Sequence, residues 1–437
     1  MAMAMVMATP PTTAPPDGVT GRATISARWR AVPLALFGLA LAWAAATNAI
    51  ANHWRVTAPD AALRWRAGDA TALVLREDQR LVRESEAGRL AAPRPAIARQ
   101  ALRAEPLTAP ALRQLGIADA LAGRPDAARG LMHLAHATSR RELGAQIWLI
   151  DDSIRRGGLA PALRHFDEAL STHLVAAQLL VPALSSALFD PALRAGLVPY
   201  LRAERPWMPR FLLYAANTPA SVQYAADLVI AAHGLPQSPP FDDINSRILS
   251  GLAAIREFAT ARVYIDRLLR SKRQGDHPDF FDAQLGPFTW LLANRAGLDT
   301  QMDRAGKLYV HIGVNQHGVA ATRILTLPFG RYRVAGATSI APGASAHARW
   351  DIQCMTPGLD HTIWKLDLDS SQSGNLPDLH IPRNCLGQKV MLTVGNSGLD
   401  AIDTGPIDAG FFDKLMLRRD FTHLQGNNIR IFGKKTI

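Results

Sequence analysis

An uninterrupted apolar run near the N-terminus is the strongest hydropathy feature of the chain. Residues 31–51 contain no charged side chain. A helix of this length, rising about 1.5 Å per residue, matches the roughly 30 Å hydrocarbon layer of a bilayer. Arg22, Arg28 and Arg30 precede the run, and basic residues favour the cytoplasmic side of a membrane. The pattern predicts a transmembrane signal anchor over 28–53 with its N-terminus in the cytoplasm.

The same run has a second interpretation as a cleaved signal peptide, because Ala49-Ile50-Ala51 fits the small-x-small cleavage pattern. The segment before the run is longer than an ordinary leader, which favours an uncleaved anchor. Its first part, residues 1–27, is rich in Pro, Thr, Ala and Gly and predicts a disordered cytoplasmic tail. Either interpretation delivers the bulk of the chain to the periplasm, as a single-pass protein of a bacterial inner membrane.

Helical periodicity dominates the next two hundred residues or so, from 59 to 270. One pattern recurs there after 34 positions. A small residue lets two helices approach closely, a large apolar residue fills the groove beside it, and glycine ends the first helix. The first copy consists of Leu115, Gly123, Ala128, Met132 and Ala135, and the second of Leu149, Gly157, Ala162, Phe166 and Ala169.

This spacing resembles the tetratricopeptide repeat, which has a period of about 34 residues. The best copy reads LRQLGIADALAGRPDAARGLMHLAHA, and the second reads IWLIDDSIRRGGLAPALRHFDEAL. The resemblance implies a helical-repeat solenoid over 59–270 with an extended face that binds a protein partner. An irregular helical bundle is the alternative that the residues leave open.

Beyond about Lys307 the apolar residues alternate with polar ones, as in Leu308, Val310 and Ile312. Turns rich in Gly, Pro, Asn and Asp separate these short segments, which is typical of strands in a sandwich. The pattern predicts an antiparallel β-sandwich over 280–424, followed by a basic tail over 425–437. The expected fold class is therefore multidomain α + β, with one transmembrane helix, a tetratricopeptide-like solenoid and a C-terminal β-sandwich.

Both cysteines, Cys354 and Cys385, lie in the predicted sandwich. Two nearby cysteines in an oxidising compartment favour a disulfide, with free buried thiols as the alternative. The run from Trp350 to Cys354, followed by IPRNC, resembles a jelly-roll sandwich of the carbohydrate-binding kind. That resemblance implies a sugar site.

A sugar site needs flat aromatic rings for the apolar face of a pyranose and planar polar groups for its hydroxyls. The alternative for each aromatic is the core of the sandwich. The main candidates are Trp350, Trp364, Tyr332 and Arg349, with Tyr309, Asp351, Asn375 and Gln388 as further members.

The formal net charge of +11 comes from 41 Arg and 7 Lys. Such a balance favours polyanionic partners. Outside the cytoplasm, acidic polysaccharide or anionic lipid fits better than nucleic acid, which we do not expect as a partner. Heavy arginine usage can also reflect the base composition of a genome, which leaves the charge without a functional meaning.

Metal and catalytic motifs are weak in this sequence. Asp360, Asp367 and Asp369 offer oxygen ligands for Ca²⁺, although solvated acids at strand ends are the simpler interpretation. His133 with His136, and His311 with His317, lack the spacing of a metal site. We therefore expect neither metal nor cofactor.

No Walker loop, dinucleotide-binding glycine pattern or GxSxG motif occurs in the chain. The sequence predicts a non-enzymatic, membrane-anchored periplasmic adaptor that contacts envelope polysaccharide, or its assembly machinery, through the sandwich. One alternative is a pure protein-binding scaffold in which the sandwich only caps the solenoid. Another is a polysaccharide-modifying enzyme with catalytic carboxylates in the sandwich.

Overall fold

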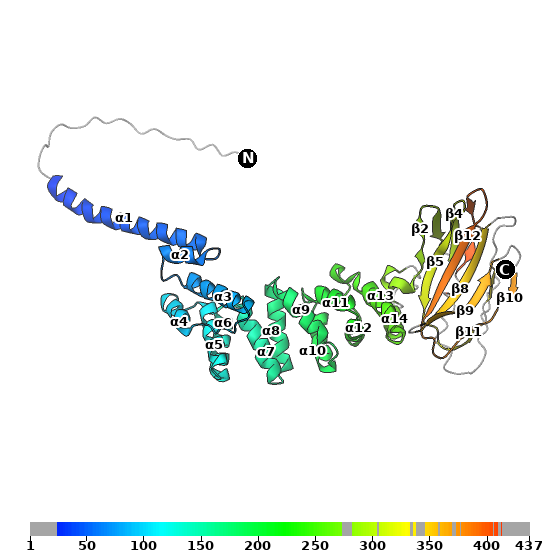
Figure 1. The fold of residues 1–437 in the computed structure, drawn as a ribbon, viewed down its shortest axis with the longest axis horizontal. Helices are drawn as coiled ribbons and strands as arrows, with labels where there is room; N and C mark the ends of the chain where they lie inside the picture. The colour runs from blue at the N-terminus through cyan, green and yellow to red at the C-terminus, as the bar shows by residue number, and fades with distance from the viewer. Residues whose placement is uncertain are drawn as a thin grey trace, which may run out of the picture. The chain divides into compact units, whose positions relative to one another are not determined.

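The computed structural model describes residues 24–272, 282–303, 306–332, 335–337, 346–356, 359–368, 373–375, 377–404, 406–409 and 412. The chain is α + β, with helices first and antiparallel sheets after them (Figure 1). The chain divides into two compact units, Met1–Ala145 and Gln146–Ile437. The predicted C-terminal tail and all but the last residues of the predicted N-terminal tail lie outside the described residues.

The first helix, α1 (Thr24–Trp54), covers the predicted anchor. Its segment Pro33–Trp54 is long and apolar enough to cross a membrane, by length and composition. Large side chains such as Leu34 and Trp43 are 71% and 67% exposed. An exposed apolar surface of this extent is typical of a helix that meets lipid rather than protein.

Five shorter helices complete the first unit, and proline stands in the first turn of α2, α4, α5 and α6, where its fixed φ favours helix initiation. A small apolar core forms from Leu73 and Val74 with alanines that let the helices approach closely. The helices are α2 (Pro59–Trp65), α3 (Ala70–Glu86), α4 (Pro95–Ala104), α5 (Ala109–Leu121) and α6 (Pro125–Thr138).

The second unit begins within α7 and contains the remaining helices. They bury long rows of leucine and alanine. Their bounds are α7 (Leu143–Arg155), α8 (Leu159–Thr172), α9 (Ala176–Ser186), α10 (Pro191–Arg202), α11 (Met208–Ala216), α12 (Val222–Ala231), η1 (Pro239–Phe241), α13 (Ile244–Ala254), α14 (Phe258–Lys272) and η2 (Ala283–Phe288).

Glycine ends several of these helices in the left-handed conformation. Gly123 after α5 and Gly157 after α7 have φ of 75° and 72°, as the repeated pattern predicted. At each position the glycine N–H and the N–H of the following residue donate to carbonyls of the preceding helix, which satisfies groups that would otherwise remain unpaired at a helix end.

Two larger sheets follow the helices. One has the strand order β1-β5-β12-β8-β9, and the other has β13-β4-β3-β2 with β14 also paired to β4. Two short pairs, β6 with β11 and β7 with β10, complete the antiparallel set. The strands are β1 (Leu291–Leu292), β2 (Asn294–Arg295), β3 (Leu298–Met302), β4 (Lys307–Ile312), β5 (His317–Leu325), β6 (Gly330–Tyr332), β7 (Ala335–Ala337), β8 (Ala346–Thr356), β9 (Leu359–Asp367), β10 (Ser373–Asn375), β11 (Leu379–Ile381), β12 (Gln388–Asn396), β13 (Ile402–Asp403) and β14 (Ile407–Asp408).

One apolar core joins the two larger sheets. Alternate residues of β12, such as Val390 and Leu392, are fully buried, and so are Leu308 and Val310 of β4. The alternation in the sequence therefore locates these strands correctly. The alternation did not predict strands β1, β2 and β3, which precede the expected first strand at Lys307. They have no more than five residues each and show little alternation.

Candidate functional site

The structure corrects the expected role of Trp350 in sugar binding. Its side chain is fully buried, with ring centroids 5.7 Å from Trp290 and 5.0 Å from Phe412. Rings at these distances and tilts form a packed aromatic cluster. Trp350 follows Ala348 and precedes Ile352 on the inner face of β8, so its ring has no face open to a glycan.

Trp364 and Tyr332 are corrected for the same reason, since they are only 5% and 6% exposed. The Trp364 indole donates to the Pro377 carbonyl at 3.0 Å. The Tyr332 hydroxyl donates to the Pro328 carbonyl at 2.8 Å. Their polar atoms hold nearby loops, so these aromatics stabilise the strand region instead of forming an open platform.

Arg349 lies on the opposite face of β8. Its Nε donates to Asp351 Oδ2 at 2.9 Å, and this hydrogen bond raises the pKa of the guanidinium. Gln388, a further candidate, is fully buried and bonds the backbone of Leu327 and Cys385. Tyr309 remains 43% exposed on β4. Among the candidates whose side chains the structure describes, the polar and aromatic groups are therefore not brought together in one groove.

Cys354 and Cys385 lie at disulfide-bonding distance, with Cα atoms 5.5 Å apart. Cys354 is the last residue of β8 that pairs with β12, and Cys385 lies in the segment before β12, so the bond links β8 to the chain that enters its neighbouring strand. Closing a loop between residues 31 positions apart removes about 3 to 4 kcal/mol of denatured-state freedom in the loop-entropy model. The pair suggests an oxidising compartment.

Two of the three acids considered as Ca²⁺ ligands, Asp360 and Asp367, lie apart on β9 and have different basic neighbours. Asp360 pairs with Arg256 of the helical part, and Asp367 lies opposite Arg349 in the register of β9 and β8. Asp369 lies outside the described residues.

A buried carboxylate, Glu77 on α3, organises the first unit. Arg80 donates to it at 2.7 Å, and Arg94 donates through its backbone N at 2.9 Å and its Nη2 at 2.6 Å. Burial alone would raise the pKa of Glu77, but these hydrogen bonds outweigh it and lower the pKa to about 2. The carboxylate therefore stays ionised and ties α3 to the start of α4.

A second ion network crosses the same unit at Arg113 of α5. Its guanidinium donates to Asp78 at 2.6 Å and to Glu142 at 2.7 Å. Burial lowers the pKa of Arg113, but the two carboxylates outweigh that effect and raise it. Gln114 donates to Asp78 and to the Val74 carbonyl, which completes the link between α5 and α3.

Beside these networks lies an open groove of about 290 Å³. Its walls come from α3, from the turn between α4 and α5, and from the residue after α6. Its lining is mostly apolar or small and polar, with Glu105 as its one charged residue, and Leu107 of the lining is 81% exposed. The lining is Thr71, Val74, Leu75, Glu105, Leu107, Thr108, Ala109, Pro110 and Ser139.

In the second unit, Asp167 of α8 holds the start of α11. The Trp207 indole donates to Asp167 Oδ1 at 2.8 Å, and Arg205 pairs with Oδ2 at 3.0 Å. Burial, together with the charge of Asp167, raises the pKa of the neighbouring Tyr200. Like Glu77, Asp167 links two helices. Both of its carboxylate oxygens are bonded to Trp207 and Arg205, an arrangement that favours a structural role over proton transfer.

The second unit also contains a smaller pocket of about 90 Å³ between the ends of α12, α13 and α14. Tyr264 and Asn245 line its buried part, where the Tyr264 hydroxyl donates to Asn245 Oδ1 at 2.7 Å. Arg267 contacts His233 Nδ1, and the Arg267 Nε is a buried donor without an acceptor among the described residues. The pocket therefore offers a cation and an unused donor to an oxygen-bearing group.

Three helix ends of the second unit replace the usual glycine with a larger residue. Glu204, His233 and Arg256 have φ of 51°, 68° and 62°. Each side chain reaches another element: Glu204 accepts from Ser238, His233 contacts Arg267, and Arg256 pairs with Asp360. Positive φ in such residues costs of order 1 kcal/mol or more, which these contacts offset.

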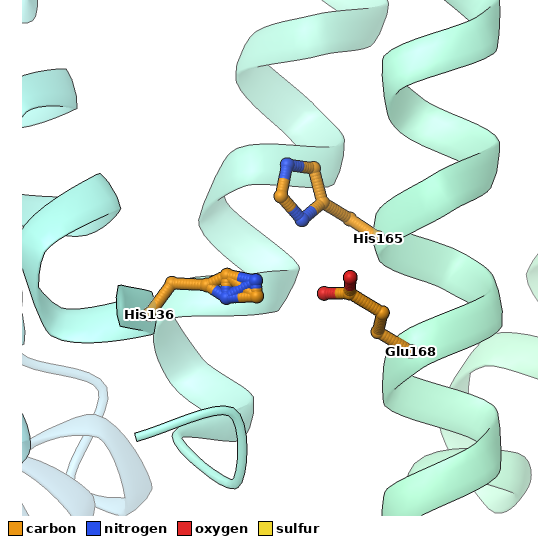
Figure 2. A group of neighbouring side chains, drawn as sticks. All are labelled: His136, His165 and Glu168. Atoms are coloured by element: carbon orange, nitrogen blue, oxygen red, sulfur yellow. The ribbon is translucent and has the colours of Figure 1, made fainter. Parts of the chain in front are cut away.

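Figure 2 shows the side chains of His136, His165 and Glu168. His165 and Glu168 stand three residues apart on α8 and extend from one side of that helix. His136 belongs to α6, which lies in the first unit. The three residues are thus divided between the two units, and neither unit contains all of them.

Sequence reasoning did not find the groove or the pocket. Both are lined by turns that meet helices distant in the sequence, and neither contains a motif with fixed spacing. Arg267 lies on a helix that was predicted, but its partner His233 ends another helix 34 residues earlier.

No family model matches the sequence, and no curated protein is significantly similar to it.

Proposed function

We propose that the chain is a non-enzymatic scaffold of a bacterial inner membrane, with its body in the periplasm and a protein partner on its helices. The observation that carries this proposal is the exposed apolar segment Pro33–Trp54, followed by helices whose buried charges bond other helices. A span of this length fits lipid, and exposed helix surfaces without a catalytic arrangement fit recognition.

The helices are proposed to form a tetratricopeptide-like solenoid. Support comes from the repeated positions, because Ala128 and Met132 are fully buried and their counterparts Ala162 and Phe166 are 1% and 8% exposed. A Cβ at Gly116 would lie 2.9 Å from Met132, so α5 and α6 approach closely there. These are the close helix contacts that a small-large-small pattern produces.

The C-terminal strands are proposed to form a β-sandwich of the jelly-roll kind. The apolar core shared by both larger sheets, and the antiparallel pairing of every described ladder, support this architecture. In this arrangement the sandwich contributes a rigid end to the helical part through Arg256 and Asp360.

The partner is proposed to be a protein that places side chains in the groove of the first unit. The groove is large enough for an apolar side chain, since a cavity of about 150 Å³ already holds benzene. Leu107, exposed at its edge, supplies apolar surface that a partner would cover.

Site-specific photo-crosslinking in cells tests this function. A photoreactive phenylalanine analogue replaces Leu107, and a matched variant carries it at Tyr309 on β4, which is also exposed. We expect a discrete protein adduct from position 107 and none from position 309. Adducts at position 309 alone, or no adduct at position 107, would contradict partner binding by the helices.

Acidic polysaccharide is the second candidate partner. Lys365 and Lys389 lie with Arg349 on the face of the five-stranded sheet opposite the core. The full chain should then bind alginate in a pull-down, and the double variant Lys365→Glu and Lys389→Glu should not. Equal retention of the double variant would remove this face as the site.

A further inference from the structure

We infer that α2 and the turn before it form a membrane-surface element, in which exposed tryptophan and arginine side chains bind phospholipid headgroups. The inference rests on the proposed membrane span of α1. It goes further, because it assigns lipid contact to residues outside the span and explains how the first unit is held at the membrane.

The backbone reverses direction immediately after α1. Hydrogen bonds from Arg55 to Ala51 and from Ala58 to Trp54 close the turn, and α2 starts at Pro59. From the far end of α2, Arg66 donates to Asn48 Oδ1 on α1 at 2.8 Å. Because Asn48 precedes Trp54 by six residues, α2 returns along about 9 Å of α1 toward the apolar segment.

This return is fixed by packing as well as by the Arg66 bond. Ala51 of α1 is 1% exposed and Ala62 of α2 is fully buried, so small residues occupy the buried sides of the two helices. Figure 1 shows α2 folded against the end of α1. Leu63 packs against the apolar core of the first unit. Thus α2 packs against α1 and, through Leu63, against that core.

The side chains that this packing leaves outside are those of a membrane interface. Trp54, Val56 and Trp65 are 42%, 63% and 49% exposed. Tryptophan is enriched at both membrane–water boundaries, because its ring is apolar and its N–H is polar. Thr47 and Asn48 are the first polar side chains of α1 after Arg30, which favours an end of the hydrocarbon layer within the last two turns of the segment Pro33–Trp54. Trp65 precedes Arg66, which contacts Asn48, and so lies near this level.

The charge of the same segment fits phosphate. Arg55, Arg64 and Arg66 lie in it, and Asp60 is the one acid between Trp54 and Gly68. Basic side chains close to an anionic lipid surface are attracted to its phosphate groups. The continuity of this surface with the lipid-facing side of α1 favours the membrane as its occupant over a soluble protein.

Depth-dependent fluorescence quenching of the full chain in lipid vesicles tests the inference. Since Cys354 and Cys385 are bonded to each other, a single introduced cysteine gives one labelling site. A fluorophore is attached at Trp65→Cys or, as a second variant, at Val56→Cys. Leu41→Cys in α1 serves as the buried-in-lipid reference, and Leu121→Cys at the exposed end of α5 as the aqueous control.

The vesicles contain phosphatidylcholine and phosphatidylglycerol with a nitroxide on either the headgroup or the acyl chain. We expect headgroup nitroxide to quench positions 65 and 56, acyl nitroxide to quench position 41, and neither to quench position 121. If position 41 is quenched while positions 65 and 56 behave like position 121, the span stands and the surface element is wrong. If position 41 also stays in water, the proposed anchor and this inference both fail.

Discussion

Arg256, which follows the end of α13, pairs with Asp360 of β9, 104 residues further along the chain. Its Nη2 lies 3.2 Å from Asp360 Oδ2, and Nη1 also contacts the Thr356 carbonyl. Arg256 has a φ of 62°, where glycine would be unstrained. The helical part of the second unit is thus joined to its sheet by a residue that accepts backbone strain to make the contact.

Substitution of Arg256 separates strain from contact. Arg256→Ala loses the ion pair and keeps the positive φ, whereas Arg256→Gly loses the ion pair and releases the strain. Because both charged side chains are partly exposed, the pair contributes only about 0 to 1 kcal/mol. We expect the glycine variant to be about 1 kcal/mol more stable than the alanine variant, measured by urea unfolding in detergent. An alanine variant that equals or exceeds the glycine variant would contradict the strain.

At position 123 the native residue is already glycine, so substitution there introduces backbone strain instead of releasing it. A Cβ there would meet no atom within 4 Å, so only the φ of 75° opposes a side chain. We expect Gly123→Ala to destabilise the protein by about 1 kcal/mol. The matched control is Gly130→Ala, inside α6 and equally uncrowded, which should stabilise by about 0.5 to 1 kcal/mol. Thermal unfolding of both variants checks the pair, and a shift of the same sign in both would refute the explanation.

Glu77 makes stability depend on acid pH. Its pKa falls from 4.5 to about 2 on folding, so its contribution is fully present above pH 4.5 and is lost as the pH falls toward 2. The shift corresponds to about 3 kcal/mol. We expect Glu77→Gln to be less stable than the parent by about that amount at neutral pH, with the difference shrinking below pH 4.5. Unfolding titrations across this range measure it, and a difference that stays constant with pH would show that the charge is not responsible.

Substitution of Trp350 should lower the stability of the protein without a separate effect on glycan binding. Removing its ring from the cluster with Trp290 and Phe412 leaves a cavity, so Trp350→Ala should cost about 3 to 5 kcal/mol. Tyr309→Ala, on an exposed ring, should cost about 0.5 kcal/mol or less. Urea unfolding distinguishes the two. A Trp350 variant of normal stability with altered glycan binding would restore the sugar hypothesis.

Local sequence patterns predicted those parts of the fold that depend on neighbours in the chain. The charge-free run marked α1, Gly123 and Gly157 marked helix ends, and the alternation of Leu308 to Ile312 marked β4. The burial of Trp350 could also be predicted, because Trp350, Ile352 and Cys354 alternate with polar residues and share one face of the strand. The sugar-binding prediction for Trp350 was based on its aromatic ring and not on the face of the strand where it lies.

The remaining features depend on contacts that no local pattern encodes. Glu77 meets Arg94 across 17 residues, and Arg113 meets Glu142 across 29. Arginines are so frequent in this chain that none of these pairs stands out in the sequence. The return of α2 along α1 is likewise set by one long-range bond from Arg66 and by alanine packing.

A dual reporter fused after Ile437 tests the central claim, that α1 spans the membrane and the body of the chain lies beyond it. Alkaline phosphatase is active only after export, whereas green fluorescent protein exported unfolded through the general secretory route does not fluoresce. The account predicts an active phosphatase fusion and a dark fluorescent fusion in the same bacterial host. A fluorescent fusion with inactive phosphatase would place the body in the cytoplasm and contradict the anchor, the oxidising compartment and the periplasmic scaffold together.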